Sequence, residues 1–102
     1  MIIVNKTDTF SKWLDGLKDI TGRARILARI KRMEQGHLGD VKPVGDGVHE
    51  MKFTFGPGYR SYYFYMMKNK VVLLNGGDKS SQSKDIKKAK DIVAQIKGNH
   101  DE

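Results

Sequence analysis

The chain contains no cysteine, and this absence removes three kinds of chemistry. A disulfide framework, a thiolate metal site and a cysteine nucleophile are excluded, and the composition fits a reducing compartment such as the cytoplasm. No apolar run approaches the ~20 residues that a membrane-spanning helix needs. The opening stretch MIIVNKTDTF has neither a basic segment nor a cleavage site. We therefore expect no signal peptide, no membrane partner and a cytoplasmic location.

Signatures of several enzyme classes are missing as well. His37, His49 and His100 fall on different predicted elements and not at the spacings of metal ligands. No serine occupies a nucleophile elbow, and no glycine-rich phosphate loop opens a helix. We therefore expect neither a bound metal nor a small-molecule cofactor.

Positive charge is what the chain has in excess. Its 102 residues include 19 lysines and arginines against 12 aspartates and glutamates, for a net charge of +7. Such a basic domain favours a polyanionic partner, namely RNA, DNA, a membrane surface or an acidic protein. Good solubility is the simpler alternative. The length predicts one domain that spans residues 1–102.

Three segments have the apolar periodicity of helices. The first follows an N-cap signal at Thr7 and Asp8 and carries apolar residues from position 10 to position 17. The second and third cover about 21–35 and about 84–97, and Gly98 is expected to end the third.

Arg25, Arg29 and Arg32 follow one another at i, i+4 and i+7 of the second predicted helix, opposite its apolar residues. We call these three residues the arginine stripe. Like charges at this spacing cost a helix a few tenths of a kcal/mol per pair. The stripe therefore suggests a polyanion or an acidic partner protein, with a plain solvated face as the alternative.

Most β-forming residues lie between the second and third helices. Alternation and turn residues predict three antiparallel strands joined by tight turns, at residues 48–55, 59–67 and 71–74. Residues 2–4 add an edge or first strand, and residues 40–44 form a short extended piece in a glycine-rich loop.

The alternation in the first of these strands assigns its two faces. Met51 and Phe53 are expected to face the core, whereas Val48, Glu50 and Lys52 face a side that is at least partly wet. The predicted fold class is α+β, in which two N-terminal helices and one C-terminal helix pack on an antiparallel β-sheet.

Three cations fall near the ends of the predicted strands: Lys52, Arg60 and Lys79. We call them the cation cluster. Arg60 follows a Gly-Pro-Gly turn, so it lies across the hairpin from Lys52, and Lys79 comes just after the last strand. Such a cluster can hold a phosphate, which arginine grips through its planar fork. Surface charge around a sheet edge is the simpler alternative.

A phosphate of RNA in the cation cluster makes cleavage possible without a metal. The 2′-hydroxyl attacks its own phosphorus when a base removes its proton, a cation stabilises the crowded phosphoryl group and an acid protonates the leaving oxygen. Glu50 lies on the same predicted face as Lys52.

The order helix, helix, sheet, helix, together with three short segments, resembles the RelE/HigB-type toxins of bacterial toxin–antitoxin modules. The segments are GDVKP at 39–43, GPGYR at 56–60 and GDKSSQ at 77–82. Within the RelE/ParE superfamily, the chain is most similar to the branch called addiction module killer proteins. The resemblance spans residues 10–96.

This resemblance implies a microbial-RNase-like RelE fold and the toxin component of a type II module. The implied activity is that of an mRNA interferase, a ribosome-dependent mRNA endonuclease that inhibits translation without a metal. The implied partners are a cognate helix-turn-helix antitoxin, the ribosome and mRNA.

The resemblance also implies residue roles. Arg60 would steady the scissile phosphate, Lys79 would contact or protonate the leaving group, and Lys52 would act as base or phosphate ligand. We expect further RNA-binding contacts from the arginine stripe, Glu50 and Tyr62. The chain departs from relatives that have two lysines where it has Glu50 and Lys52, and from relatives that carry a C-terminal tyrosine or histidine in the site.

Two other functions stay open at this point. ParE-type toxins share the fold, lack the nuclease site and poison DNA gyrase. A basic nucleic-acid-binding module without toxicity is the third possibility. The fold alone does not separate these functions.

Overall fold

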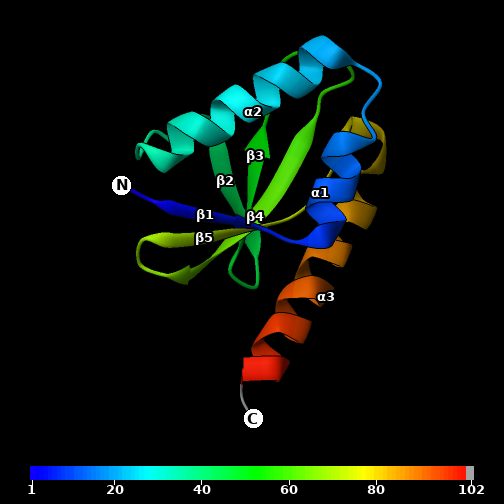
Figure 1. The fold of residues 1–102 in the computed structure, drawn as a ribbon. Helices are drawn as coiled ribbons and strands as arrows, with labels where there is room; N and C mark the ends of the chain where they lie inside the picture. Colours follow the sequence, from blue (N-terminus) through cyan, green and yellow to red (C-terminus); the bar gives the residue numbers. More distant parts are fainter. Residues whose placement is uncertain (101–102) are drawn as a thin grey trace.

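The computed structural model describes residues 1–100. Figure 1 shows the elements in chain order, which are β1 (Ile3–Lys6), α1 (Asp8–Asp15), α2 (Ile20–Glu34), β2 (Val41–Gly45), β3 (Val48–Lys52), β4 (Arg60–Met67), β5 (Lys70–Gly77), the 3-10 turn η1 (Lys79–Ser81) and α3 (Gln82–His100). Among residues 1–100, none of the helices combines the length and apolar character that crossing a bilayer demands.

The strands form a single five-stranded sheet in the order β1-β5-β4-β3-β2. The predicted α+β class is confirmed, but the sheet is not wholly antiparallel, because β1 pairs parallel to β5, with Val4 opposite Val71. The extended piece expected at 40–44 is a full edge strand, β2, whose Lys42 lies opposite Glu50 of β3. The glycine-rich composition of this segment had favoured a loop over a strand.

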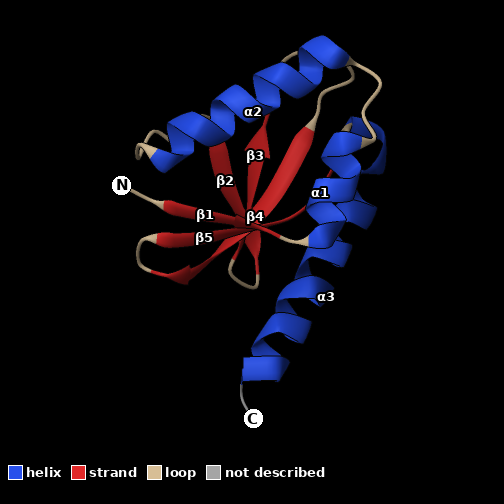
Figure 2. Ribbon diagram, in the orientation of Figure 1, coloured by secondary structure: helices blue, strands red, loops and turns tan. Residues whose placement is uncertain are grey.

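Helices cover both faces of the sheet (Figure 2). One core joins α1 and α2 to the sheet through residues such as Phe10, Ile26 and Met51. The other core joins α3 to the sheet, with Val93 of α3 beside Val48 of β3. The expectation of a wet second face on β3 was therefore wrong at Val48 and Glu50, which α3 buries, and holds only at Lys52 near the strand end.

The first helix starts at the predicted N-cap, and the last helix ends later than expected. The Thr7 hydroxyl accepts the backbone N–H of Phe10, and an Asp19 carboxylate oxygen accepts that of Gly22. Gly98, expected to end the last helix, lies inside α3, which continues to His100. Glycine lowers helix stability by about 1 kcal/mol relative to alanine, which a helix of 19 residues tolerates.

One hydrogen bond joins the start of α2 to the turn that precedes β4. Tyr59 donates its hydroxyl to the second oxygen of the Asp19 carboxylate at 3.0 Å. The Gly22 N–H first, and then the Tyr59 hydroxyl, hold the pKa of Asp19 below its usual value because they stabilise the charged carboxylate. Tyr59 also packs edge-on against Trp13 of α1. The hydrogen bond to Asp19 and the packing against Trp13 together hold Tyr59, the residue that precedes Arg60.

Replacing Tyr59 with phenylalanine (Tyr59→Phe) keeps the ring packing and removes the hydroxyl. We expect a thermal midpoint lower by a few degrees at neutral pH. A carboxyl whose folded-state pKa is depressed contributes stability above its unfolded value of about 3.9 and loses it as pH falls through the folded-state pKa. The difference between wild type and variant should therefore shrink in acid, as followed by circular dichroism. The assignment is contradicted if the difference in thermal midpoint between wild type and Tyr59→Phe stays constant in acid. It is also contradicted if that difference is unchanged when both proteins carry Asp19→Asn.

Candidate functional site

Sheet register brings the cation cluster together. Lys52 lies opposite Arg60 in the β3–β4 pair, and Arg60 lies opposite Gly77 in the β4–β5 pair. Lys79 follows two residues later, and its backbone N–H donates to the carbonyl of Pro57 at 3.4 Å. The three cations, predicted from strand ends, thus gather around the turn that carries Pro57.

Gly58 in that turn has a backbone that only glycine adopts easily, with φ of +76°. A Cβ placed there would lie 3.3 Å from Nη1 of Arg60 and 3.4 Å from Cβ of Lys79. The absence of a side chain at Gly58 therefore lets Arg60 and Lys79 approach the same stretch of backbone. Gly58 thus supplies the left-handed position of the predicted Gly-Pro-Gly turn.

Arg60 is held from two sides and is only 6% exposed. Its Nη1 donates to the carbonyl of Gly58 at 2.8 Å, and its Nε lies 3.7 Å from Oε2 of Glu50. The Nε has no hydrogen-bond partner among the described residues. The guanidinium is therefore held in position by the turn before β4 and by β3.

Glu50 is a buried carboxylate, 1% exposed, at the centre of the site. Its Oε2 accepts hydrogen bonds from Nε2 of Gln82 at 2.9 Å and from the hydroxyl of Tyr62 at 3.3 Å. Its Oε1 lies 3.8 Å from Nζ of Lys42. Groups from β2, β4 and the first residue of α3 thus converge on one carboxylate of β3, as a buried charge requires.

Burial changes the expected roles of Glu50 and Tyr62. Both were predicted to bind RNA, but α3 covers them, so neither side chain presents a surface to an RNA strand. Burial and the nearby Glu50 carboxylate raise the pKa of the Tyr62 phenol, which stays a neutral donor. Glu50 instead contacts the Arg60 guanidinium, and Tyr62 donates its hydroxyl to Glu50.

Gln82 and Lys42 were missed by the sequence analysis as members of this site. Both lie in segments that carried the family resemblance, GDKSSQ at 77–82 and GDVKP at 39–43. That signal could have marked them. Their contact with Glu50 depends on the position of α3 and on the existence of β2, which periodicity did not provide.

Lys52 and Lys79, in contrast, are exposed. Neither ammonium group makes a hydrogen bond or ion pair with another residue in the range 1–100. They flank the fixed Arg60 guanidinium as two free cations. The arrangement suits an anion that reaches the site from solvent.

The three members of the arginine stripe have different surroundings, and the alternative of a plain solvated face does not hold for Arg29. Arg29 donates from Nη1 to the carbonyl of Lys52 at 2.7 Å and from Nη2 to that of Asp40 at 2.9 Å. Its guanidinium also lies over the ring of Phe53, 4.9 Å from the centroid. Burial lowers the pKa of Arg29 below its usual value. Arg29 therefore stabilises the end of β3 that carries Lys52.

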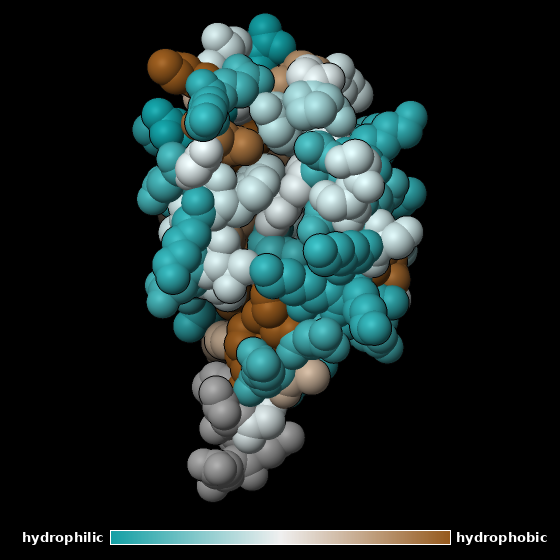
Figure 3. Space-filling view, turned by 90° about the vertical axis from the view of Figure 1, so that its right-hand side faces the viewer, coloured by the Kyte–Doolittle hydropathy of each residue, from teal (hydrophilic) through white to brown (hydrophobic). Residues whose placement is uncertain are grey.

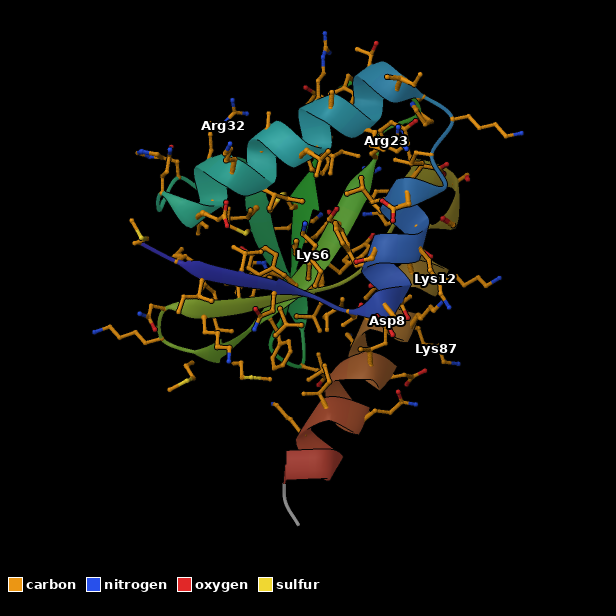
Figure 4. All side chains as sticks on the ribbon, in the orientation of Figure 1. Lys6, Asp8, Lys12, Arg23, Arg32 and Lys87 are labelled. Carbon is orange, nitrogen blue, oxygen red and sulfur yellow. The ribbon has the colours of Figure 1, made fainter. Side chains whose placement is uncertain are left out.

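The other two members of the stripe differ from Arg29. Arg25 lies over the Phe55 ring at 5.1 Å, on the surface of α2. Arg32 is exposed near the C-terminal end of α2 (Figure 4). All three arginines line a groove of about 290 Å³ together with Phe53, Thr54 and Phe55. The groove borders the strand end at Lys52.

The part of the chain that the structure describes contains no group of three histidine or carboxylate side chains placed to hold a metal ion. The arrangement that the described residues do build is a fixed guanidinium between two free ammonium groups. Its chemistry is that of phosphate or carboxylate recognition.

Comparison with known proteins gives the family. The sequence pattern of the family described as Phage derived protein Gp49-like (DUF891) matches residues 12–97, which include the whole cation cluster. The chain belongs to the Gp49-like family. An uncharacterized protein of Haemophilus influenzae (strain ATCC 51907 / DSM 11121 / KW20 / Rd) is 45% identical over 95 residues, which cover 93% of this chain and 96% of that protein.

The Gp49-like family is one of the toxin–antitoxin-related addiction module killer families. The resemblance to addiction module killer proteins is thereby confirmed at the level of the family. Membership indicates the toxin of a toxin–antitoxin pair and a cognate antitoxin as its partner.

Replacing Glu50 with glutamine (Glu50→Gln) keeps the shape of the side chain and removes its charge. We expect the free energy of unfolding to fall by roughly 3 kcal/mol, because the buried Arg60 guanidinium loses its compensating charge. Gln82→Ala should cost about 1–2 kcal/mol by removing a hydrogen bond to the same carboxylate. Urea denaturation measures both. Lys84→Ala, an exposed change on the same helix, is the control and should match wild type. A Glu50→Gln protein as stable as that control would show that the carboxylate charge is not needed.

Proposed function

We propose that this Gp49-like protein is the toxin of a type II toxin–antitoxin pair and cleaves mRNA on the ribosome, in the cytoplasm, without a metal ion. The observation that carries the proposal is the fixed Arg60 guanidinium between two exposed lysines. This arrangement matches a phosphate that arrives on a flexible strand. The proposed antitoxin is a helix-turn-helix protein.

The proposed reaction is an attack of the RNA 2′-hydroxyl on the adjacent phosphorus. The 2′-oxygen forms a bond to phosphorus, the bond to the 5′-oxygen breaks, and the products are a 2′,3′-cyclic phosphate and a free 5′-hydroxyl. Arg60 binds the phosphoryl oxygens as negative charge builds on them. Lys52 accepts the 2′-hydroxyl proton or binds a phosphoryl oxygen, and Lys79 contacts or protonates the leaving 5′-oxygen.

Preorganisation supports this assignment of roles. Arg60 is held by Gly58 and Glu50, so it does not need to reorient when charge develops on the phosphate. Lys52 lies at the end of β3 and Lys79 lies in η1 just after β5, and both side chains are exposed, so they keep the freedom to follow a substrate. The rigid member stabilises charge, and the mobile members handle protons or secondary contacts.

The surface around the cluster extends the proposed RNA path. Arg29 contacts the backbone of Lys52, so the arginine stripe and the cation cluster meet at the end of β3. Arg25 and Arg32 continue the positive charge along α2. We assign this extension to ribosomal RNA, because a salt-dependent, sequence-independent contact suits a row of arginines.

The test of the proposed activity uses the exposed lysines, since their removal does not threaten the fold. Lys52→Ala/Lys79→Ala should lower mRNA cleavage about 100-fold or more, in line with the loss of preorganised cations around a phosphate. Primer extension on a cellular mRNA after a short pulse of expression measures new 5′ ends in translated regions. Lys84→Ala/Lys87→Ala removes the same charge from exposed positions of α3 and should cleave normally.

Other outcomes of that experiment point to other functions. Growth arrest without new 5′ ends, retained in Lys52→Ala/Lys79→Ala and accompanied by a DNA-damage response, would indicate a gyrase poison. No growth arrest in the wild type would leave a nucleic-acid-binding module. Equal cleavage by both double variants would overturn the site assignment.

Arg32→Ala tests the proposed contact with ribosomal RNA. Arg32 is exposed, so the variant should fold as wild type, and its affinity for purified ribosomes should fall at low salt. The slope of log affinity against log salt should decrease by about one, as expected for the loss of one phosphate contact. Sedimentation with ribosomes at several salt concentrations measures this slope. An unchanged slope would exclude Arg32 from the interface.

A further inference from the structure

An apolar groove lies at the other end of the sheet from the cation cluster. It has a volume of about 490 Å³ and is lined by the end of β4, the start of β5 and the last turns of α3. We call it the hairpin groove, and its residues are Phe64, Tyr65, Met66, Met67, Lys70, Ile96 and Lys97. Met67 is 63% exposed, which is unusual for a large apolar side chain.

The geometry of the hairpin bears directly on the exposure of Met67. The β4–β5 pairing is irregular between Tyr65 and Met67, as in a β-bulge, and Met67 pairs with Lys70 at the turn. Figure 1 shows α3 extending past this end of the sheet. Figure 3 shows the side of the molecule that lies to the right in Figure 1, where a small group of brown apolar side chains near the end of α3 is surrounded by hydrophilic residues.

The chemistry of the hairpin groove restricts its occupant. Two methionines give it walls that adapt to different apolar side chains. Lys70 and Lys97 line it, and Lys68 is exposed in the adjoining turn. Within the described residues, none of these three lysines forms an ion pair, and no carboxylate lines the groove. The complementary ligand is an amphipathic segment with apolar side chains on one face and carboxylates beside them.

A second copy of this chain fits less well, because each copy carries a net charge of +7 and presents the same lysines. RNA matches the lysines but not the apolar walls. The family supplies a suitable protein, since a toxin of this type has a cognate antitoxin. We propose that an acidic amphipathic helix of the cognate antitoxin docks in the hairpin groove.

The position of the groove determines what such docking does. Arg60 and Met67 are the two ends of β4, separated by seven residue steps of about 3.3 Å, or about 23 Å. An antitoxin helix in the hairpin groove therefore leaves Lys52, Arg60 and Lys79 uncovered. The bound antitoxin then neutralises the toxin sterically, because the complex is too large to enter the ribosomal site at which the toxin acts. This steric exclusion from the ribosome rests on the proposed function, whereas the docking of the antitoxin helix does not.

Met67→Glu tests the docking. The probe is the small protein encoded next to the gene for this chain, purified and titrated by calorimetry. The added carboxylate in the groove should weaken binding about 10-fold or more, through lost apolar contact and repulsion from acidic side chains. Ile20→Glu is the matched control, since Ile20 is 72% exposed and lies on α2, and it should bind as wild type.

Expression in cells gives a second readout. Met67→Glu alone should arrest growth as wild type does, and co-expression of the neighbouring protein should rescue wild type and Ile20→Glu but not Met67→Glu. If wild type causes no arrest, the proposed function fails, while calorimetry still decides the docking.

Four results would overturn the docking proposal. The first is equal binding by wild type and Met67→Glu, and the second is absence of binding by the wild type. The third is loss of binding in Lys52→Ala/Lys79→Ala, which would place the antitoxin on the cation cluster. The fourth is a wild-type dimer that Met67→Glu converts to a monomer, which would identify a second copy as the occupant.

Discussion

One buried negative charge organises the functional end of this protein. Glu50 is a carboxylate enclosed by protein, and a buried charge is tolerated only when neighbouring groups satisfy it. Gln82, Tyr62, Arg60 and Lys42 do so from α3, β4 and β2. Because removal of any partner leaves part of a charge unpaired, the positions of these elements depend on one another. The Arg60 guanidinium, which we assign to phosphate binding, is thus positioned by the Glu50 carboxylate, which we do not assign to the substrate.

The same requirement explains which parts of the site the sequence could reveal. Lys52, Arg60 and Lys79 were found because strand register is a local property, and turn residues such as Gly58 set it. The burial of Glu50 was not found, because alternation separates two faces of a strand and does not say which face a distant helix will cover. The Gln82 contact links residues 32 positions apart, and no periodic pattern encodes it. The segment resemblance was the available signal.

The arginine stripe shows a different limit of sequence reading. Spacing alone placed Arg29 and Arg32 on one face of the helix, but the two side chains have different surroundings. Arg29 donates hydrogen bonds to the carbonyl of Lys52 at the end of β3 and to that of Asp40 in the loop before β2, which also accepts the backbone N–H of Lys52. An arginine in a basic row can thus be a structural ligand of the backbone. Helical periodicity does not distinguish that role from binding, because both place the charge on the same side of the helix.

The parallel pairing of β1 with β5 has a consequence for the order in which a ribosome makes this protein. β1 cannot pair until β5, which begins at Lys70, has been made. Glu50 lacks one hydrogen-bond donor until Gln82 has been made. The complete sheet therefore cannot form until β5 has left the exit tunnel, and the full support of Arg60 cannot form until Gln82 has left it. Long-range pairings of this kind fold late. The site that we propose therefore forms only after α3 has begun, because its central carboxylate takes a hydrogen bond from a residue 32 positions later in the chain.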